Sequence, residues 1–384
     1  MRSRRIRARR GVEWRPACSQ PAQMAYNTGM AQLSLVLPFA LPAPEFASDL
    51  VRALEAPALA TLLSRSSGMR RVALEGAARA LPHELWIARA LGLNHGAGGL
   101  TPGVAASAMR GYGLDPGDGT WLVVNPSHIQ IARTHLMMGD VRQLDLREDE
   151  GRALFDAARP CFEEAGHALA YGAPDTWFMR ADDWDEIRTS SPDAAVGMNL
   201  TDWMPSGPPA RAFRKLQNEV QVTWFTHPAN AAREARGQAP INSIWPWGEA
   251  SIASEHASRL VANAGARSLE RPSLATWAVP GWLDALGERR LAGLEGALDT
   301  LDDNTMLVCG NVSAPAIAAD WGGWVQQMQL LETELFAPLL DAVRRGRIAR
   351  LRMMLSHRDG HLDTTTTPMA QRKFWRRPTL EALT

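Results

Sequence analysis

The chain has few cysteines and no long apolar run. Its 384 residues include three scattered cysteines, Cys18, Cys161 and Cys309, with no Cys-x-x-Cys pair and no zinc-finger spacing. The odd number and wide spacing of these cysteines argue against a disulfide framework and favour a reducing compartment. No apolar stretch approaches the ~18 residues that a membrane helix needs. We therefore expect a cytoplasmic protein with no membrane partner.

The chain also has no net charge, because Lys+Arg and Asp+Glu both number 41. A strongly basic nucleic-acid binder is thereby excluded for the chain as a whole. Apolar residues make up 46% and charged residues 21%, so a substantial core can form. The length suits two or three units, or one large core with an insertion.

The charge is concentrated at the start of the chain. Residues 1–15 contain seven arginines and one acid, Glu13, and carry a formal charge of +6. This segment is either an arm that binds RNA or another anion, or sequence upstream of a true start at Met30 or Met24. We favour the second interpretation, because residues 11–29 show no apolar periodicity. We treat residues 1–30 as a basic extension or a mis-called start, and we expect residues 1–29 to be dispensable and unfolded.

Strand-like and helix-like segments alternate along the rest of the chain, which predicts an α/β fold. The expected strands are 33–39, 121–124, 176–180, 241–247 and 306–309, with a hairpin over 348–367 that turns at Asp359-Gly360. The expected helices are 49–64, 82–93, 148–166, 208–224, 282–301 and 321–345. Residues 92–119, rich in glycine and small side chains, predict a loop. We expect residues 31–384 to form one unit, with 120–240 as a possible inserted subdomain.

Common catalytic motifs are missing. There is no phosphate-binding P-loop, no Gly-x-Ser-x-Gly elbow, and no strand before the glycines of residues 111–119. His357, His361 and Asp363 offer two imidazoles and a carboxylate to a metal. The alternative, which we favour, is a hairpin tip with polar side chains facing solvent. We therefore predict no metal site and no cofactor.

The segment from Trp203 to Gly248 combines polar amides with tryptophans, of which the chain has 14. It forms either a ligand cleft with aromatic walls or a packed joint in which asparagines bridge backbone groups. A packed joint is the interpretation that we favour. His227 follows the predicted helix that ends near Trp224. A histidine there interacts favourably with the negative end of the helix, so we favour helix capping as its role. The candidate residues are His227, Asn230, Asn242, Trp245, Trp247 and Gly248.

Several of these residues form a familiar pattern. Asn242-Ser243-Ile244-Trp245-Pro246-Trp247-Gly248 resembles the Asn-x-x-Trp-x-Trp-Gly segment of archaeal-type cofactor-independent phosphoglycerate mutases, members of the alkaline phosphatase superfamily. The chain also resembles the bacterial RpfE-type regulatory proteins, which often carry the mutase label. That resemblance spans about residues 33–378 and rests on residues 121–138, 216–219, 227–237 and 374–378.

The resemblance implies a reduced alkaline-phosphatase-like core with an inserted α+β region. It also implies an Asp after the first strand, a Ser or Thr nucleophile, and an Asp-Glu-Ala-Gly-His-like stretch of metal ligands. Here the first strand leads into Pro38-Phe39-Ala40-Leu41-Pro42, with no acid before Glu45, and residues 311–320 contain no histidine. Two dications require several carboxylates and imidazoles.

We therefore expect a non-catalytic regulatory or binding protein that contacts a protein partner or a small metabolite. One alternative is an active phosphoglycerate mutase. A second alternative is nucleic-acid binding through the arginine-rich start of the chain, which we consider less favoured because the whole chain is neutral.

Overall fold

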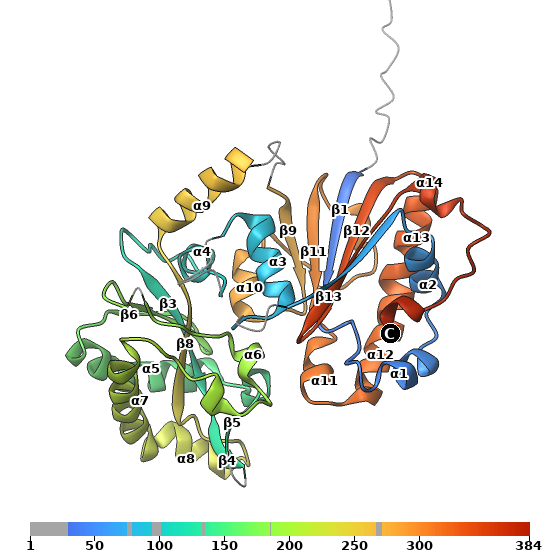
Figure 1. The fold of residues 1–384 in the computed structure, drawn as a ribbon. Coiled ribbons are helices and arrows are strands. Elements are labelled where there is room, and N and C mark those ends of the chain that lie inside the picture. Colours follow the sequence, from blue (N-terminus) through green and yellow to red (C-terminus); the bar gives the residue numbers. More distant parts are fainter. Residues whose placement is uncertain (1–29, 75–78, 94–100, 133–134, 185, 266–270) are drawn as a thin grey trace, which may run out of the picture.

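The computed structural model describes residues 30–74, 79–93, 101–132, 135–184, 186–265 and 271–384. Residues 1–29 of the predicted N-terminal extension lie outside these residues, and Met30 already belongs to the first strand. Within them, no helix is long and apolar enough to cross a membrane. The chain builds two main sheets, one mostly parallel and one antiparallel, with helices around and between them (Figure 1).

The larger sheet has seven strands in the order β10-β9-β11-β1-β12-β13-β2. The first five run parallel, and β13 and β2 are antiparallel to their neighbours. The strands are β1 (Met30–Leu37), β2 (Gly68–Ala73), β9 (Ser273–Trp277), β10 (Arg289–Arg290), β11 (Thr305–Cys309), β12 (Ile348–His357) and β13 (Gly360–Thr366). Strand β1 is central and apolar, as expected of a parallel strand covered on both faces.

Helices cover both faces of this sheet (Figure 1). On one face pack α1 (Ala47–Ala53), α2 (Pro57–Ser64), α12 (Trp321–Leu331), a π-helical turn (Glu332–Phe336) and α13 (Ala337–Arg344). The short α11 (Ser313–Ile317) and α14 (Pro368–Gln371) lie beside them. On the other face pack α3 (Pro82–Leu91), α4 (Ala105–Gly111) and α10 (Gly281–Leu286).

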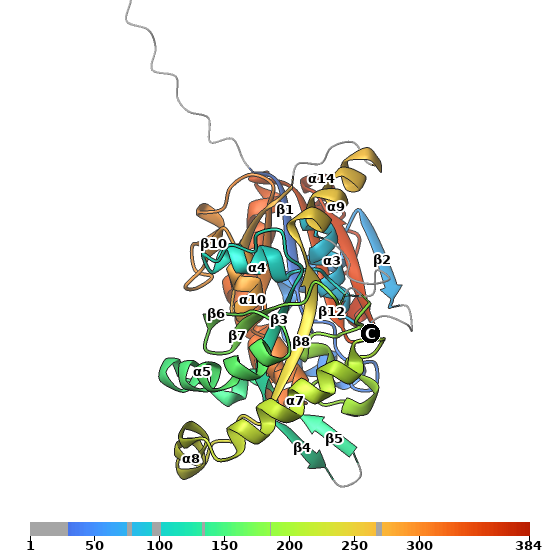
Figure 2. The same cartoon turned by 90° about the vertical axis from the view of Figure 1, so that its left-hand side faces the viewer.

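The second sheet has four antiparallel strands in the order β6-β7-β3-β8. They are β3 (Trp121–Ser127), β6 (Leu169–Ala173), β7 (Thr176–Arg180) and β8 (Ser243–Ala250). One face packs on α5 (Glu148–Glu164), α7 (Ala210–Phe225) and α8 (Pro228–Ala235). The other face shares a core with α3, α4, α10 and the large sheet. Helices α7 and α8 and the hairpin β4 (Ile129–Ala132)–β5 (His135–Met138) lie at the end of the molecule away from the start of β1 (Figure 2).

The structure confirms an α/β fold with an inserted α+β region, and it corrects three local expectations. Residues 49–64 form two helices rather than one, because α2 begins at Pro57, which supplies no N–H to the preceding turn. The predicted loop 92–119 contains the buried helix α4. The predicted helix 282–301 ends after α10, since Arg289 and Arg290 pair with β9 instead.

Two further elements complete the arrangement. Helix α6 (Pro192–Ala195) lies between the two sheets, near the β12–β13 hairpin (Figure 1). Helix α9 (Ile252–Gly265) leads from the second sheet back to β9. The carboxyl ends of β1 and β12 lie on the side of the large sheet that faces α6. In open α/β folds, ligands bind at the carboxyl ends of the parallel strands.

Candidate functional site

A buried polar cluster lies at the carboxyl ends of β1 and β12. Ser356, near the end of β12, is fully buried, and its Oγ lies 2.9 Å from Nδ1 of His83. The N–H of Phe39, just after β1, donates to the same Oγ at 3.3 Å. The serine hydroxyl is then free to donate to a neutral imidazole. Burial lowers the pKa of His83 to about 4, so that the ring is neutral near pH 7.

The next residue along α3 is also buried and titratable. Glu84 accepts the N–H of Leu81 at 2.8 Å and so caps its own helix. Burial raises the pKa of Glu84 to about 7, against the opposing effects of hydrogen bonds from Ser191 and Leu81 and of the nearby Arg358. The carboxyl group is therefore partly protonated at neutral pH.

Two arginines hold the segment around residues 193–196 beside this cluster. Arg358, in the turn after β12, donates to the carbonyls of Asp193, Ala194 and Val196 at 3.3, 2.9 and 2.6 Å. Arg142 binds both carboxylate oxygens of Asp193, each at 2.9 Å. Arg358 therefore joins the carboxyl edge of the large sheet to this segment, and Arg142 holds the carboxylate of the same segment in place.

A cavity of about 170 Å³ opens beside this cluster, between the second sheet and the loop after β9. Its charged lining groups are Arg142, Asp175 and Asp193. Thr176 donates to Asp175 at 3.0 Å. One terminal nitrogen of Arg142, Nη2, is buried and has no hydrogen-bond partner among the described residues. The remaining lining residues are Asn125, Val141, Thr176, Ser191, Pro192, Val279, Pro280, Gly281 and Trp282.

These groups do not suit a pair of metal ions. Across the described parts of the chain, no three His, Cys, Asp or Glu side chains gather in a way that could hold a metal ion. The strand ends present Phe39, Gly310, Asn311 and Ser356 at positions where dications need carboxylates or imidazoles. Of the two buried carboxyl groups nearby, Asp193 is engaged by Arg142 and Glu84 accepts the N–H of Leu81. The donor set thus disagrees with a two-metal centre.

The two predicted tryptophans are fully buried in β8. Trp245 and Trp247 belong to the core that lies between the sheets. The Trp245 indole donates to the carbonyl of Ser190 at 2.7 Å, and the Trp247 indole donates to Oδ1 of Asn125 at 2.7 Å. Pro246 lies on an edge strand, as predicted, because β8 pairs only with β3. Trp247 therefore orients Asn125, which lines the cavity. Neither Trp245 nor Trp247 lines the cavity.

Gly248 allows the chain to pass close to the loop before α4. Its φ is +71°, and a Cβ there would lie 2.8 Å from a methyl group of Val104. Its carbonyl accepts the N–H of Val104 at 3.0 Å. The position therefore requires glycine for conformation and space.

The three polar candidates hold backbone groups. Asn230 donates to the carbonyls of Trp224 and Ile241 and accepts the N–H of Ile241. Asn242 binds both backbone groups of Ile129, at 2.8 Å each. His227 accepts the N–H of Ala229 and so caps the start of α8, not the end of the preceding helix as predicted. These contacts have the geometry of a packed joint.

The histidines of the β12–β13 hairpin are not assembled as a ligand set. Asp363 forms a paired contact with the guanidinium of Arg352, with Nε to Oδ1 at 2.9 Å. His357 accepts the N–H of Asp359, and burial lowers the pKa of both His357 and His361. The expectation of a solvent-facing tip is wrong in part, because Arg358 is docked onto the segment around α6.

Sequence reasoning did not select His83, Glu84, Ser356, Arg358, Arg142 and Asp193. One available signal was His83 next to Glu84 in a mostly apolar helix, since a glutamate is seldom fully buried without a partner. A second was Arg358 in a tight hairpin turn. Neither signal indicates which distant residue is the partner.

Comparisons with known proteins agree with the fold and are limited in sequence. No family model matches the chain. A stretch of 66 residues is 30% identical to a 2,3-bisphosphoglycerate-independent phosphoglycerate mutase of Methanosarcina barkeri, which is 17% of this chain and 17% of that enzyme. The homology to that enzyme is weak.

Two solved structures are similar over most of the chain. The PH0037 protein from Pyrococcus horikoshii aligns with a TM-score of 0.53 at 11% identity, over 92% of both chains. They share a fold. A cofactor-independent phosphoglycerate mutase from Thermoplasma acidophilum aligns with a TM-score of 0.43 at 14% identity, over 92% of this chain and 94% of that one.

Proposed function

We propose that this protein is a non-catalytic binding or regulatory protein on a mutase-like fold. The observation that carries the proposal is the closed network at the carboxyl edge of the large sheet. A catalytic centre there would need exposed nucleophiles and ligands. Ser356 is inaccessible to solvent, and the nearby arginines bind Asp193 and the backbone around it.

The alternative, an active phosphoglycerate mutase, conflicts with the charge of the cavity. Two carboxylates line it, Asp175 and Asp193, and its one guanidinium already binds Asp193 and Asp140. A phosphoglycerate carries several negative charges and would meet net repulsion there. The cavity instead suits a small ligand with an ammonium or hydroxyl group that donates to Asp175, and an oxygen that accepts from Nη2 of Arg142.

The size of the cavity limits the ligand to a small metabolite. Its volume is about 170 Å³, below the roughly 300–1,000 Å³ typical of pockets that bind drug-sized ligands. Trp282 lines the cavity and is 8% exposed, so a bound ligand should change its fluorescence. An ammonium group near this indole would also gain a cation–π attraction.

The enzymatic alternative is tested by elemental analysis and by a mutase assay on 3-phosphoglycerate, with and without added Mn²⁺. We expect no stoichiometric metal and no turnover. Two metals per chain, with turnover that a chelator abolishes, would overturn the proposal. RNA binding through residues 1–15 is tested by comparing how the full chain and a chain that starts at Met30 bind RNA. We expect no difference between them.

The binding role is tested by calorimetric titration with ethanolamine, glycerol and 3-phosphoglycerate. We expect ethanolamine to bind, and Asp175→Asn to weaken it about tenfold or more, since a charge-assisted bond is lost. The matched control is Asp183→Asn, at an exposed carboxylate outside the cavity. Binding of 3-phosphoglycerate alone would contradict the assignment of the ligand.

A further inference from the structure

Among the residues that the structure describes, the large sheet ends at β2, whose outer edge has no further strand. This strand pairs with β13 and is the last in the sheet order. Leu74 donates its N–H to Asp359, and antiparallel pairing alternates along a strand. Met69, Arg71 and Ala73 therefore turn their backbone N–H and C=O groups to the open side. All three residues are exposed, so a further strand could pair there.

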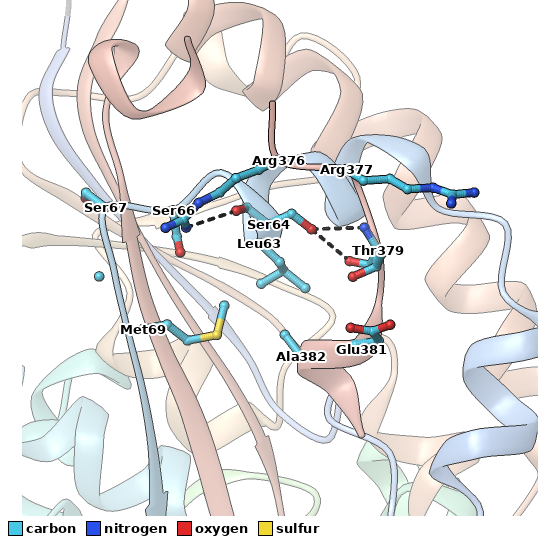
Figure 3. A pocket seen from close by; sticks show the side chains of 11 residues that line it. Leu63, Ser64, Ser66, Ser67, Met69, Arg376, Arg377, Thr379, Glu381 and Ala382 are labelled. Atoms are coloured by element: carbon cyan, nitrogen blue, oxygen red, sulfur yellow. Dashed lines mark hydrogen bonds between the residues drawn. The ribbon is translucent and has the colours of Figure 1, made fainter. Parts of the chain in front are cut away.

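A preformed hollow of about 570 Å³ lies next to the start of β2 (Figure 3). Leu63, Met69 and Ala382 give it apolar walls, and Arg376, Arg377 and Glu381 add charge. Two of its lining residues are joined by hydrogen bonds. Ser64 Oγ donates to the carbonyl of Thr379 at 3.1 Å and accepts its N–H at 2.9 Å. These bonds hold Ser64 and Thr379 together at one side of the hollow.

Cationic side chains surround both features. They are Arg71, Arg372, Lys373, Arg376 and Arg377, and Glu381 is the carboxylate among the residues that line the hollow. Arg70 points to the opposite face of β2, where it lies across from Asp363. The hydrogen bonds that these cations form run to backbone carbonyls. Arg71 binds Ala382 at 2.7 Å, Lys373 binds Ser66 at 3.0 Å and Arg376 binds Ser64 at 3.3 Å. Around the hollow, these cations outnumber Glu381, the carboxylate among its lining residues, and this excess of positive charge favours an acidic partner.

Large apolar side chains are exposed beside the same surface. Phe374 is 80% exposed and Trp375 is 69% exposed, and their rings meet edge to face at 5.3 Å. Met69 at the start of β2 is 43% exposed. Aromatic residues with arginines are typical of protein-binding surfaces.

We propose that β2 and the adjacent hollow bind an extended acidic peptide segment of another protein. The segment would add a strand to the free edge of β2, with its acidic residues near the arginines and an apolar side chain in the hollow. Arg70 and Arg71 disfavour pairing of β2 with a second copy of itself, because like charges would meet across the new edge. A single-stranded nucleic acid could use the charge and the aromatic rings, but it has no strand backbone to match the open edge.

The test uses the full chain and a fluorescently labelled hexapeptide that alternates glutamate with valine. Binding is followed by anisotropy at low and at physiological salt. We expect binding that weakens with salt. The double variant Arg376→Glu with Arg377→Glu should weaken it tenfold or more. The matched control, Arg214→Glu on the exposed face of α7, should leave it unchanged.

Two further probes separate strand addition from charge attraction. A peptide with the same side chains and methylated backbone nitrogens cannot pair with a strand edge, so we expect it to lose binding. A lysine-valine hexapeptide should not bind. Equal binding of the methylated peptide would overturn the proposal. So would failure of the acidic peptide to bind, or binding of an oligouridylate instead. Melting curves that match the wild type show that the variants are folded. Where peptide binding changes the tryptophan fluorescence of the protein, Trp375→Ala should abolish that change.

Discussion

Replacing Glu84 by glutamine should change how the free energy of unfolding depends on pH. Glu84 is buried and its pKa is raised from 4.5 to about 7, mainly by desolvation. It binds its proton more tightly in the folded state than in the unfolded one. Its contribution to stability is therefore fully present below about pH 4.5 and is lost as the pH rises through about 7.

His83, one residue earlier, acts in the opposite direction. Burial lowers its pKa from 6.5 to about 4, so the folded state disfavours the charged ring. Its contribution is fully present above pH 6.5 and is lost as the pH falls through about 4. Each of these pKa changes corresponds to about 3 kcal/mol. Between pH 4.5 and 6.5 the two effects largely cancel in the wild type.

The single variants should separate the two effects. Relative to the wild-type profile, Glu84→Gln should become more stable by about 3 kcal/mol from pH 4.5 to 6.5, because His83 then acts alone. His83→Gln should become less stable by about 3 kcal/mol from pH 4.5 to 7. The charged neighbours, Asp193, Arg142 and Arg358, are the same in all three proteins.

The assay is urea unfolding followed by tryptophan fluorescence at four pH values between 4.5 and 7.5. The quantity that matters is the difference in slope between each variant and the wild type, so an overall loss of stability does not obscure it. Glu234→Gln, at an exposed carboxylate on α8, serves as the control and should run parallel to the wild type. Parallel profiles for Glu84→Gln and the wild type would refute the reasoning.

Three further predictions concern the second sheet and the helix α8 that packs on it. Trp245→Ala should cost about 3–5 kcal/mol, because the ring is fully buried, and Asn242→Ala about 1–3 kcal/mol, because it leaves the backbone of Ile129 without partners. In denaturant melts, a loss below about 1 kcal/mol for Trp245→Ala would contradict the packed joint. Arg233 is fully buried and binds Glu150 at 2.7 Å, so Arg233→Met should cost about 3–5 kcal/mol by leaving a buried carboxylate poorly compensated. A melt within 1 kcal/mol of the wild type would show that Arg236, the other partner of Glu150, suffices.

Much of the local structure followed from the sequence. The apolar runs predicted β1, β7 and β11, and Asp359-Gly360 marked the turn between β12 and β13. Trp245 and Trp247, two residues apart on a strand, share one core as their spacing predicts. These features depend on neighbours within a few residues, so the local pattern of side chains is enough to determine them.

Only the tertiary structure determined the candidate site and the early end of the predicted helix 282–301. His83 lies 273 positions from Ser356, and Arg142 lies 51 positions from Asp193. Their contacts depend on how the strands cross over in the sheet, which no local pattern records. Likewise, Arg289 and Arg290 extend beside β9 because an open strand edge is available there. Such contacts exist only once distant segments are brought together, and the free energy of that packing then overrides local propensity.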